Sequence, residues 1–283
     1  MYYNRCTVEI DGSDMSVVEA GSGPAVVLGS GFLWDAEMWR PQIEALAARY
    51  RVIVPELWGH GRSGPMPEGT GSVRDIARQH LALLDKLGIG RSAIVGLSLG
   101  GMWGAEMALM APDRVTALVL MDTSLAAEPA ETRDAYFGML DAIEQQRGFP
   151  EPVLAAAAPL FFSPDIQARD PLLRDGFVAR LRAWDPARIV DSVVPLGRLI
   201  FGRPDALDDL RALAMPALVA TGADDQARSL QEGRAMADRI GCVFVQIPHA
   251  GHSASLEAPD AVNRLLLGFL ADAVAPQMGE AVC

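Results

Sequence analysis

Short, uniformly apolar segments alternate with longer segments of helical periodicity along most of the chain. The apolar segments AVVLG, RVIVP, SAIVG, VTALVLMD, PALVATG and CVFVQIP occupy residues 25–29, 51–55, 92–96, 115–122, 216–222 and 242–248. Strands that are apolar throughout are buried on both faces, and helices between parallel strands provide that cover. The alternation therefore predicts an α/β fold with a mostly parallel central sheet flanked by helices.

The segments between these strands show where the helices and one hairpin lie. Two short stretches, 6–10 and 15–20, flank Asp11-Gly12-Ser13-Asp14 and predict a hairpin. We expect helices at 37–50, 72–88, 99–111, about 228–240 and about 258–271. In open α/β sheets, ligands bind beyond the carboxyl ends of the strands, so residues that follow each strand are the candidates for a site.

Residues 123–205 break the alternation. They contain helical segments interrupted by Pro and Gly, and no convincing strand. We therefore predict a core domain made of residues 1–122 and 206–283, with 123–205 inserted as a helical cap. Peripheral helices that never touch the site are the alternative interpretation of this segment.

Composition limits the classes of partner. The chain has 283 residues, of which 50% are apolar and 21% charged, as in folded soluble domains. Its net charge of −12 and its lack of a Lys/Arg run argue against nucleic acid or an anionic membrane surface as partner. The sequence does not predict the oligomeric state.

Cysteine usage and the first residues bear on location. Cys6, Cys242 and Cys283 are far apart, odd in number and without CxxC spacing, so we expect reduced thiols. The first residues, MYYNRCTVEIDG, lack the pattern of a secretory signal. No apolar run reaches the roughly 20 residues of a membrane span. These features together predict a cytoplasmic protein.

The hexapeptide GLSLGG, residues 96–101, lies directly between a predicted buried strand and a predicted helix. A serine on such a sharp turn needs small residues two before and two after it, which Gly96 and Gly100 supply. The helix directs its first N–H groups at the serine, so the Leu99 N–H is a candidate oxyanion donor. We predict that Ser98 is a nucleophile, which then requires a base, an acid and a second donor.

Five segments together resemble the α/β-hydrolase superfamily. They are GSGFLWDAEMW (29–39), PELWGHGRSG (55–64), GLSLGG (96–101), FGRPDALDDLRALAMPALVATGADD (201–225) and HAGHSASLEAPD (249–260). The resemblance extends from about residue 8 to residue 271 and is weakest in 123–205. It implies the fold and a serine hydrolase activity, and it is poorly specific for substrate.

The resemblance also implies the partners of the serine. In related sequences the base is the histidine of a Gly-His pair, here His252, with His249 as the alternative; His60 would be structural, and His80 lies inside a predicted helix. The acid usually sits three positions after the glycine that ends the strand, which points to Asp225 rather than Asp224. The order Ser98, Asp225, His252 is the order that this fold uses.

The loop after AVVLG is expected to supply the second oxyanion donor, the Phe32 N–H. Relatives usually have histidine where this chain has Ser30, and aspartate where it has Glu56. Since a backbone donor does not need the histidine ring, the oxyanion hole survives the first change.

Aromatic side chains are candidates for the substrate pocket. Trp34, beside the oxyanion loop, and Phe161, Phe162 and Trp184 of the cap are the candidates to line it, and packing within the core or the cap is the alternative for each. An apolar pocket suits an ester or lactone with a hydrophobic part.

The sequence therefore predicts a carboxylic ester hydrolase that acts on a small, partly apolar molecule through an acyl-enzyme. The alternatives are a lactonase of the enol-lactone type, a C–C bond hydrolase and a perhydrolase, all on the same triad. Neither a metal nor an organic cofactor is expected, because the chain has no HExxH, no clustered Cys/His and no GxGxxG in a first βα turn. A ligand-binding receptor on a hydrolase scaffold is the hypothesis from another class.

Overall fold

An eight-stranded sheet forms the centre of the protein. The computed structural model describes residues 3–274, and the strand order is β1-β2-β4-β3-β5-β6-β7-β8. β1 pairs with β2 and β2 with β4 in antiparallel fashion, and every other pair is parallel. The bounds are β1 Asn4–Ile10, β2 Ser13–Ala20, β3 Ala25–Gly29, β4 Arg51–Pro55, β5 Ser92–Leu97, β6 Val115–Met121, β7 Ala217–Gly222 and β8 Val243–Ile247. The predicted α/β class and mostly parallel sheet are confirmed.

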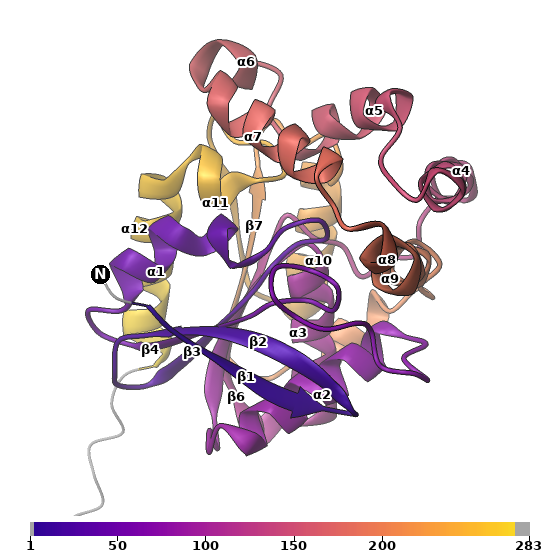
Figure 1. Ribbon diagram of the computed structural model, residues 1–283. Coiled ribbons are helices and arrows are strands. Elements are labelled where there is room, and N and C mark those ends of the chain that lie inside the picture. Colours follow the sequence, from indigo (N-terminus) through magenta and orange to yellow (C-terminus); the bar gives the residue numbers. More distant parts are fainter. Residues whose placement is uncertain (1–2, 275–283) are drawn as a thin grey trace, which may run out of the picture.

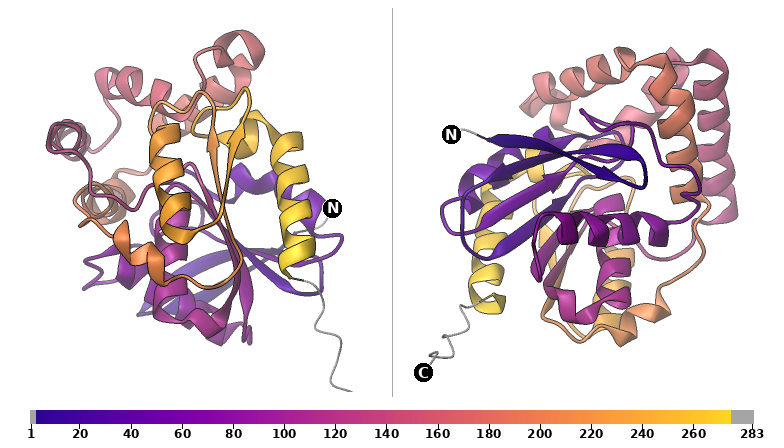
Figure 2. Two further views of the ribbon diagram at one scale, coloured as in Figure 1. Left: turned by 180° about the vertical axis from the view of Figure 1, so that it is seen from behind. Right: turned by 60° about the horizontal axis from the view of Figure 1, so that its bottom comes forward.

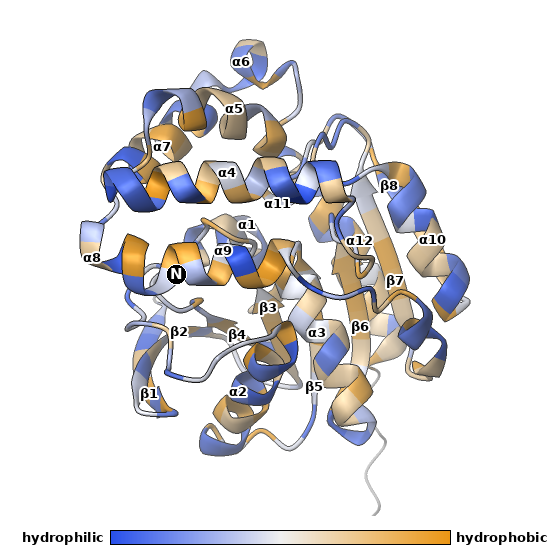
Figure 3. Ribbon diagram, turned by 90° about the vertical axis from the view of Figure 1, so that its right-hand side faces the viewer, coloured by the Kyte–Doolittle hydropathy of each residue, from blue (hydrophilic) through white to orange (hydrophobic). Residues whose placement is uncertain are grey.

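Helices cover both faces of this sheet (Figure 2). On one face lie α2 Val73–Lys86, α3 Leu99–Met110 and α10 Leu230–Ile240, and on the other α1 Arg40–Leu46 and α12 Pro259–Ala273. All six residues of β5 are buried between the two layers. This double cover explains why the strands are apolar throughout, as Figure 3 shows for the inner strands.

Local sequence determines where the helices begin and end. Ser72 accepts a hydrogen bond from the Asp75 N–H and caps α2, and Ser229 forms a capping box with Glu232 at the start of α10. α10 ends at Gly241, whose φ of 76° is left-handed. These caps place both helices within two residues of the predicted bounds.

One predicted helix differs from the observed one, and one observed helix was not predicted. The stretch 37–50 is a 3-10 turn, Ala36–Trp39, followed by the shorter helix α1, because Pro41 lacks an N–H and begins a new helix. A one-turn helix, α11 Ala254–Glu257, precedes α12 and was not predicted. Pro259 separates the two, since proline is tolerated in a first helical turn but not within a helix.

The segment between β6 and β7 is helical, and it lies over the carboxyl edge of the sheet (Figure 1). It contains α4 Ala130–Gln146, α5 Glu151–Phe161, α6 Ile166–Arg169, α7 Pro171–Arg182, α8 Pro186–Arg188 and α9 Val194–Phe201, and a π-helical turn Ile189–Val193 before α9. Every residue of 123–205 is described, and none is in a strand. We therefore use the name cap for residues 123–205.

Two further observations concern membrane spans and cysteines. Within residues 3–274, no helix is both long and apolar enough to cross a membrane. Cys6 and Cys242 have free thiols, and Cys283 lies outside the described residues.

Candidate active site

Ser98 occupies the turn between β5 and α3 in a strained conformation. Its φ is 54° and its ψ −118°, outside the left-handed well and costly for a residue with a side chain. A Cβ on Gly96 would overlap the backbone of Gly100, and a Cβ on Gly100 would overlap the backbone of Gly29. The chain therefore needs glycine at both positions for β5 and α3 to meet this closely.

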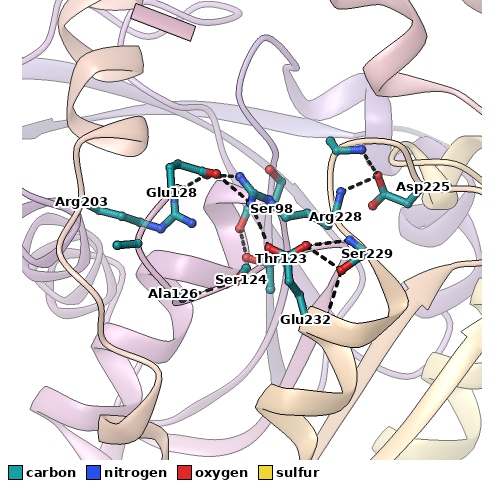
Figure 4. A network of polar contacts seen from close by, with 12 residues as sticks. Ser98, Thr123, Ser124, Ala126, Glu128, Arg203, Asp225, Arg228, Ser229 and Glu232 are labelled. Atoms are coloured by element: carbon teal, nitrogen blue, oxygen red, sulfur yellow. Dashed lines mark hydrogen bonds and ion pairs between the residues drawn. The ribbon is translucent and has the colours of Figure 1, made fainter. Parts of the chain in front are cut away.

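Neighbouring strands hold this strained residue. The Ser98 N–H donates to the Met121 carbonyl at 2.9 Å, and the Thr123 hydroxyl donates to the Ser98 carbonyl at 2.7 Å (Figure 4). With its backbone fixed, the serine side chain is partly exposed at the carboxyl edge of the sheet.

The predicted base and acid form a buried pair. His252 Nδ1 lies 2.9 Å from Asp225 Oδ2, with 7% of the histidine side chain and none of the aspartate side chain exposed. The other carboxylate oxygen, Oδ1, accepts hydrogen bonds from the backbone N–H groups of Ala227 and Arg228 at 2.8 and 2.9 Å. Asp225 is thus oriented with one oxygen on its own loop and the other on the imidazole.

The competing residues lie elsewhere. The His249 side chain is exposed, and Asp224 is only half-buried. His80 stacks on Trp103 within the core, with 4.0 Å between the ring centroids. The structure pairs Asp225 with His252, and within residues 3–274 none of these three side chains hydrogen-bonds to that pair.

A second carboxyl group, which sequence reasoning missed, lies beneath this pair. Asp122 follows β6 as Asp225 follows β7, it is fully buried, and its Oδ1 accepts a hydrogen bond from the Gly222 N–H at 2.7 Å. Burial, and then the charge of Asp225, raise the pKa of Asp122 well above its ordinary value. The available signal was its position at the end of a strand.

The loop after β3 contains the expected oxyanion donor. Phe32 lies in this loop beside Leu33, whose φ is 68°. The Leu33 N–H donates to His60 Nε2 at 3.1 Å, and His60 Nδ1 lies 2.8 Å from the Trp58 carbonyl, which assigns the proton to Nδ1. Burial lowers the pKa of His60 to about 4, so its ring is neutral and accepts at Nε2. His60 therefore supports the loop after β3, in the structural role expected of it.

Two backbone donors remain unused near Ser98. Within residues 3–274, neither the Phe32 N–H nor the Leu99 N–H has a hydrogen-bond acceptor. Leu99 is the first residue of α3, where the helix dipole is positive. Both groups are therefore available to an oxygen that acquires negative charge.

Ser98 and His252 open into one cavity between core and cap. Most of its lining is apolar, and the polar exceptions are Ser98, His252, Arg228 and Tyr136. The apolar lining side chains from the cap are Met139, Leu140, Ile143, Phe149, Val153, Ala157, Leu160, Phe161, Ile200 and Phe201. The cap therefore contributes most of the wall around the serine.

The structure separates the four candidate pocket aromatics. Phe161 lines the cavity, but Trp34, Phe162 and Trp184 do not. The ring centroids of Trp34 and Phe177 are 4.8 Å apart, and the Phe162 ring meets both of these rings at nearly right angles. They fill the interface between cap and core instead.

Trp184 lies edge-on to His60, 4.9 Å between ring centroids. It thus packs against the histidine that supports the loop after β3 and is not among the residues that line the cavity. Large aromatic side chains can pack between two layers as well as line a pocket, and their sequence position alone does not distinguish the two roles.

A buried charge cluster joins the loop after β7, which contains Asp225 and Arg228, to both ends of the cap (Figure 4). Glu128 accepts hydrogen bonds from the guanidinium of Arg228, which also pairs with Glu232, and from Arg203 Nη1 at 2.8 Å. Burial alone would raise the pKa of Glu128, but the two guanidinium groups outweigh it and hold that pKa below its ordinary value. This cluster fixes the two connections between core and cap, and no sequence pattern indicated it.

Glu56, the departure from the usual aspartate, is buried and accepts hydrogen bonds from Arg5 Nη1 and the Arg62 N–H at 2.5 and 2.8 Å. It holds the loop that contains His60. Among the described residues, no group of three or more His, Cys, Asp or Glu side chains could hold a metal ion.

The sequence matches the family model of the alpha/beta hydrolase fold over residues 24–259. A protein of Variovorax paradoxus named "Putative carbamate hydrolase RutD" is 33% identical over 90% of this chain and 94% of its own. The 3-oxoadipate enol-lactonase 1 of Acinetobacter baylyi is 22% identical over 88% of this chain and 89% of its own.

Among solved structures, a thermophilic esterase from Thermogutta terrifontis, with malate bound, superposes with a TM-score of 0.85 at 27% identity. The match covers 95% of this chain and 99% of the esterase. The similarity thus includes the cap as well as the core.

Proposed function

The chain belongs to the family of the alpha/beta hydrolase fold, and on that premise we propose that it hydrolyses a carboxylic ester with Ser98 as nucleophile, His252 as base and Asp225 as the acid that orients the base. The observation that carries the proposal is the buried Asp225–His252 pair, 2.9 Å apart, with His252 and the strained Ser98 facing one apolar cavity.

In the first half-reaction, Ser98 Oγ attacks the ester carbonyl carbon and its proton passes to His252 Nε2. The carbonyl oxygen becomes an oxyanion that accepts hydrogen bonds from the Phe32 and Leu99 N–H groups. The C–O bond to the alcohol then breaks, and His252 returns the proton to the departing oxygen. The products of this half are a free alcohol and an acyl-Ser98 ester.

In the second half-reaction, water takes the place of the alcohol. His252 removes a proton from the water as its oxygen bonds to the acyl carbon, and the same two N–H groups receive the charge. The bond to Ser98 Oγ breaks, and the proton returns to the serine. Asp225 keeps the proton of the imidazole on Nδ1 and stabilises the imidazolium in both halves.

The cavity supports a substrate with an apolar part. Its cap-derived wall is a row of aliphatic and aromatic side chains, and transfer of a hydrocarbon chain into such surroundings is favourable by about 0.8 kcal/mol per CH₂. A small, fully polar molecule would gain little from this wall.

A lactonase is the second candidate. A lactone is an internal ester, so the same steps open it, and the chain is similar to an enol-lactonase over most of its length. The similarity to the protein named a carbamate hydrolase adds a carbamate as a third kind of acyl substrate for the same residues. C–C bond cleavage and perhydrolysis share the triad, and no feature of the cavity favours either.

A receptor that only binds its ligand would not need this arrangement. The strain at Ser98 is a cost, and the orientation of Asp225 toward His252 is a specific arrangement; catalysis explains both and binding does not. Full biological activity of Ser98→Ala would favour the receptor.

The test is hydrolysis of p-nitrophenyl esters from acetate to decanoate, with Ser98→Ala as control, followed by lactones and carbamates. We expect one range of chain lengths to be hydrolysed fastest, no turnover by the variant, and a single fluorophosphonate adduct, on Ser98. Labelling that persists in Ser98→Ala would overturn the assignment of the nucleophile. Labelling without turnover of any simple ester would favour the lactone or the carbamate.

A further inference from the structure

Glu257 is a buried carboxylate that the proposed mechanism does not use. It ends the short helix α11, five residues after His252, and none of its side chain is exposed. Burial raises its pKa, while hydrogen bonds from Ser163 and Gly251 and the charge of Arg169 oppose the shift. A carboxylate removed from water in this way requires partners on both of its oxygens.

One carboxylate oxygen faces the loop that contains His252. Glu257 Oε1 accepts a hydrogen bond from the Gly251 N–H at 2.9 Å. Gly251 immediately precedes the histidine, so this bond fixes the Ala250–Gly251 peptide, one residue before His252.

The other oxygen faces the cap. Glu257 Oε2 accepts hydrogen bonds from the Ser163 N–H at 2.9 Å, the Ser163 hydroxyl at 2.5 Å and Arg169 Nη2 at 3.2 Å. Ser163 lies just after α5, and Arg169 ends α6. One side chain therefore joins the cap to the base loop, and in Figure 1 α11 lies below α6 and α7.

The cap also holds the other side of the histidine. The Ser253 N–H donates to the Phe161 carbonyl at 2.9 Å, and the Phe161 ring meets the His252 ring edge to face, 5.9 Å between centroids. A Cβ on Gly251 would overlap the backbone of Phe162 and Ser163. The absence of a side chain at Gly251 thus lets the cap approach the loop.

We propose that Glu257 is a positioning residue for the base, and that it uses cap residues 161–163 as the second half of a clamp around His252. The N–H groups on either side of His252 end on the clamp, one on the Glu257 carboxylate and the other on the Phe161 carbonyl. The alignment of His252 with Asp225 therefore depends on the seating of the cap, although neither catalytic residue belongs to the cap. The inference rests on the proposed role of His252.

Glu257→Gln is the informative substitution. The amide keeps the shape of the side chain but has one acceptor oxygen, so its NH₂ group must face either the Gly251 N–H or the Ser163 N–H. Either choice leaves a buried donor without an acceptor and lets the clamp open. Since small displacements of a catalytic group cost up to about 100-fold in rate, we expect kcat to fall about 10- to 100-fold and KM to change by less than about 3-fold.

The matched control is Glu151→Gln. Glu151, which lies in the cap, is likewise a glutamate paired with an arginine, Arg182 at 2.9 Å, but it is exposed and has no hydrogen bond to the loop that contains His252. We expect this variant to behave as wild type. Ser163→Ala is a second, milder variant, because it removes one hydroxyl from the cap half of the clamp and leaves Glu257 charged.

A spectroscopic measurement tests the clamp without any substrate. The His252 Nδ1 proton that bonds to Asp225 should give a low-field proton resonance, assigned by its loss in His252→Gln. We expect this resonance to shift or broaden in Glu257→Gln, and less so in Ser163→Ala, with Glu151→Gln unchanged. If wild type hydrolyses no ester and takes no fluorophosphonate, the proposed function fails, but the resonance still tests the clamp.

The inference is overturned if the resonance and kcat of folded Glu257→Gln match wild type, even when the variant is less stable; Glu257 would then only fasten the cap. If Glu257→Gln does not fold, an unchanged resonance and kcat in Ser163→Ala overturn it.

Discussion

The core and the cap meet around one cavity, yet they hold their polar groups in different ways. In the core, each proposed catalytic group follows a strand, and Asp225 is oriented by local backbone contacts, namely two N–H groups of its own loop. The cap presents apolar side chains to the cavity and keeps its buried charges at its margins, on Glu128 and near Glu257. Apart from the clamp that cap residues 161–163 form on His252, chemistry should therefore depend on the core, and substrate choice on the cap.

The largest expected effect on activity that tests this division comes from the loop that contains Asp225. Asp225→Asn should lower kcat about 10⁴-fold, because an amide no longer holds the imidazole in its productive tautomer. The neighbouring Asp224→Asn is the matched control, and we expect activity close to that of wild type, since Asp224 is half-exposed and contacts neither His252 nor the cavity. Steady-state ester hydrolysis by the two variants measures both effects.

A reversal of these two results would place the acid one residue earlier. Comparable losses in both variants would mean that the loop as a whole, rather than one carboxylate, orients His252.

The cap side of the comparison is tested by filling the cavity. Ala157 of α5 lines it, whereas Ala156 on the same helix is exposed. Ala157→Leu should lower kcat/KM for the longest accepted acyl chain by about 10- to 100-fold, because the pocket loses room for some methylenes, while acetate changes by less than about 3-fold. Ala156→Leu should leave the whole series as in wild type.

The readout is the profile of kcat/KM against acyl length. A uniform loss over all lengths in Ala157→Leu would contradict the division, since it would show that a cap side chain affects the chemical step rather than the fit of the substrate.

The same division explains what the sequence could predict. Parallel strands that are buried on both faces can be recognised in the sequence as apolar runs. A serine between Gly96 and Gly100 specifies a turn that few other contexts allow. The positions of Asp225 and His252 follow strands, so the sheet itself places them at one edge. These predictions needed only local pattern and topology.

The orientation of the cap side chains could not be predicted in this way. Which of Phe161, Phe162 and Trp184 faces the cavity depends on the rotation of short helices about their axes, which Pro and Gly interruptions leave open. The role of Glu257 depends on contacts with a segment about 90 residues earlier in the chain. The pattern of a single sequence does not show which distant residues are in contact. Tertiary contacts decided these cases, and the aromatic composition of the cap did not.

The smallest expected effect concerns Asp122, which lies beneath the catalytic pair in the core. Its pKa is raised in the folded protein, so the neutral form is favoured there, whereas the unfolded chain ionises near the ordinary value of 3.8. The stability that this carboxyl contributes is therefore complete below that value and is lost as the pH rises toward the folded pKa. Asp122→Asn is neutral at every pH and avoids this loss.

We expect Asp122→Asn to keep ester hydrolysis within about 5-fold of wild type, because the amide oxygen can accept from the Gly222 N–H and its NH₂ group can donate to Asp225. Its Tm relative to wild type should rise between pH 5 and pH 8, by roughly 2–4 °C for each kcal/mol of ionisation cost avoided. Thermal unfolding of both proteins at the two pH values measures this difference. A difference in Tm that does not change with pH would show that Asp122 does not titrate in this range.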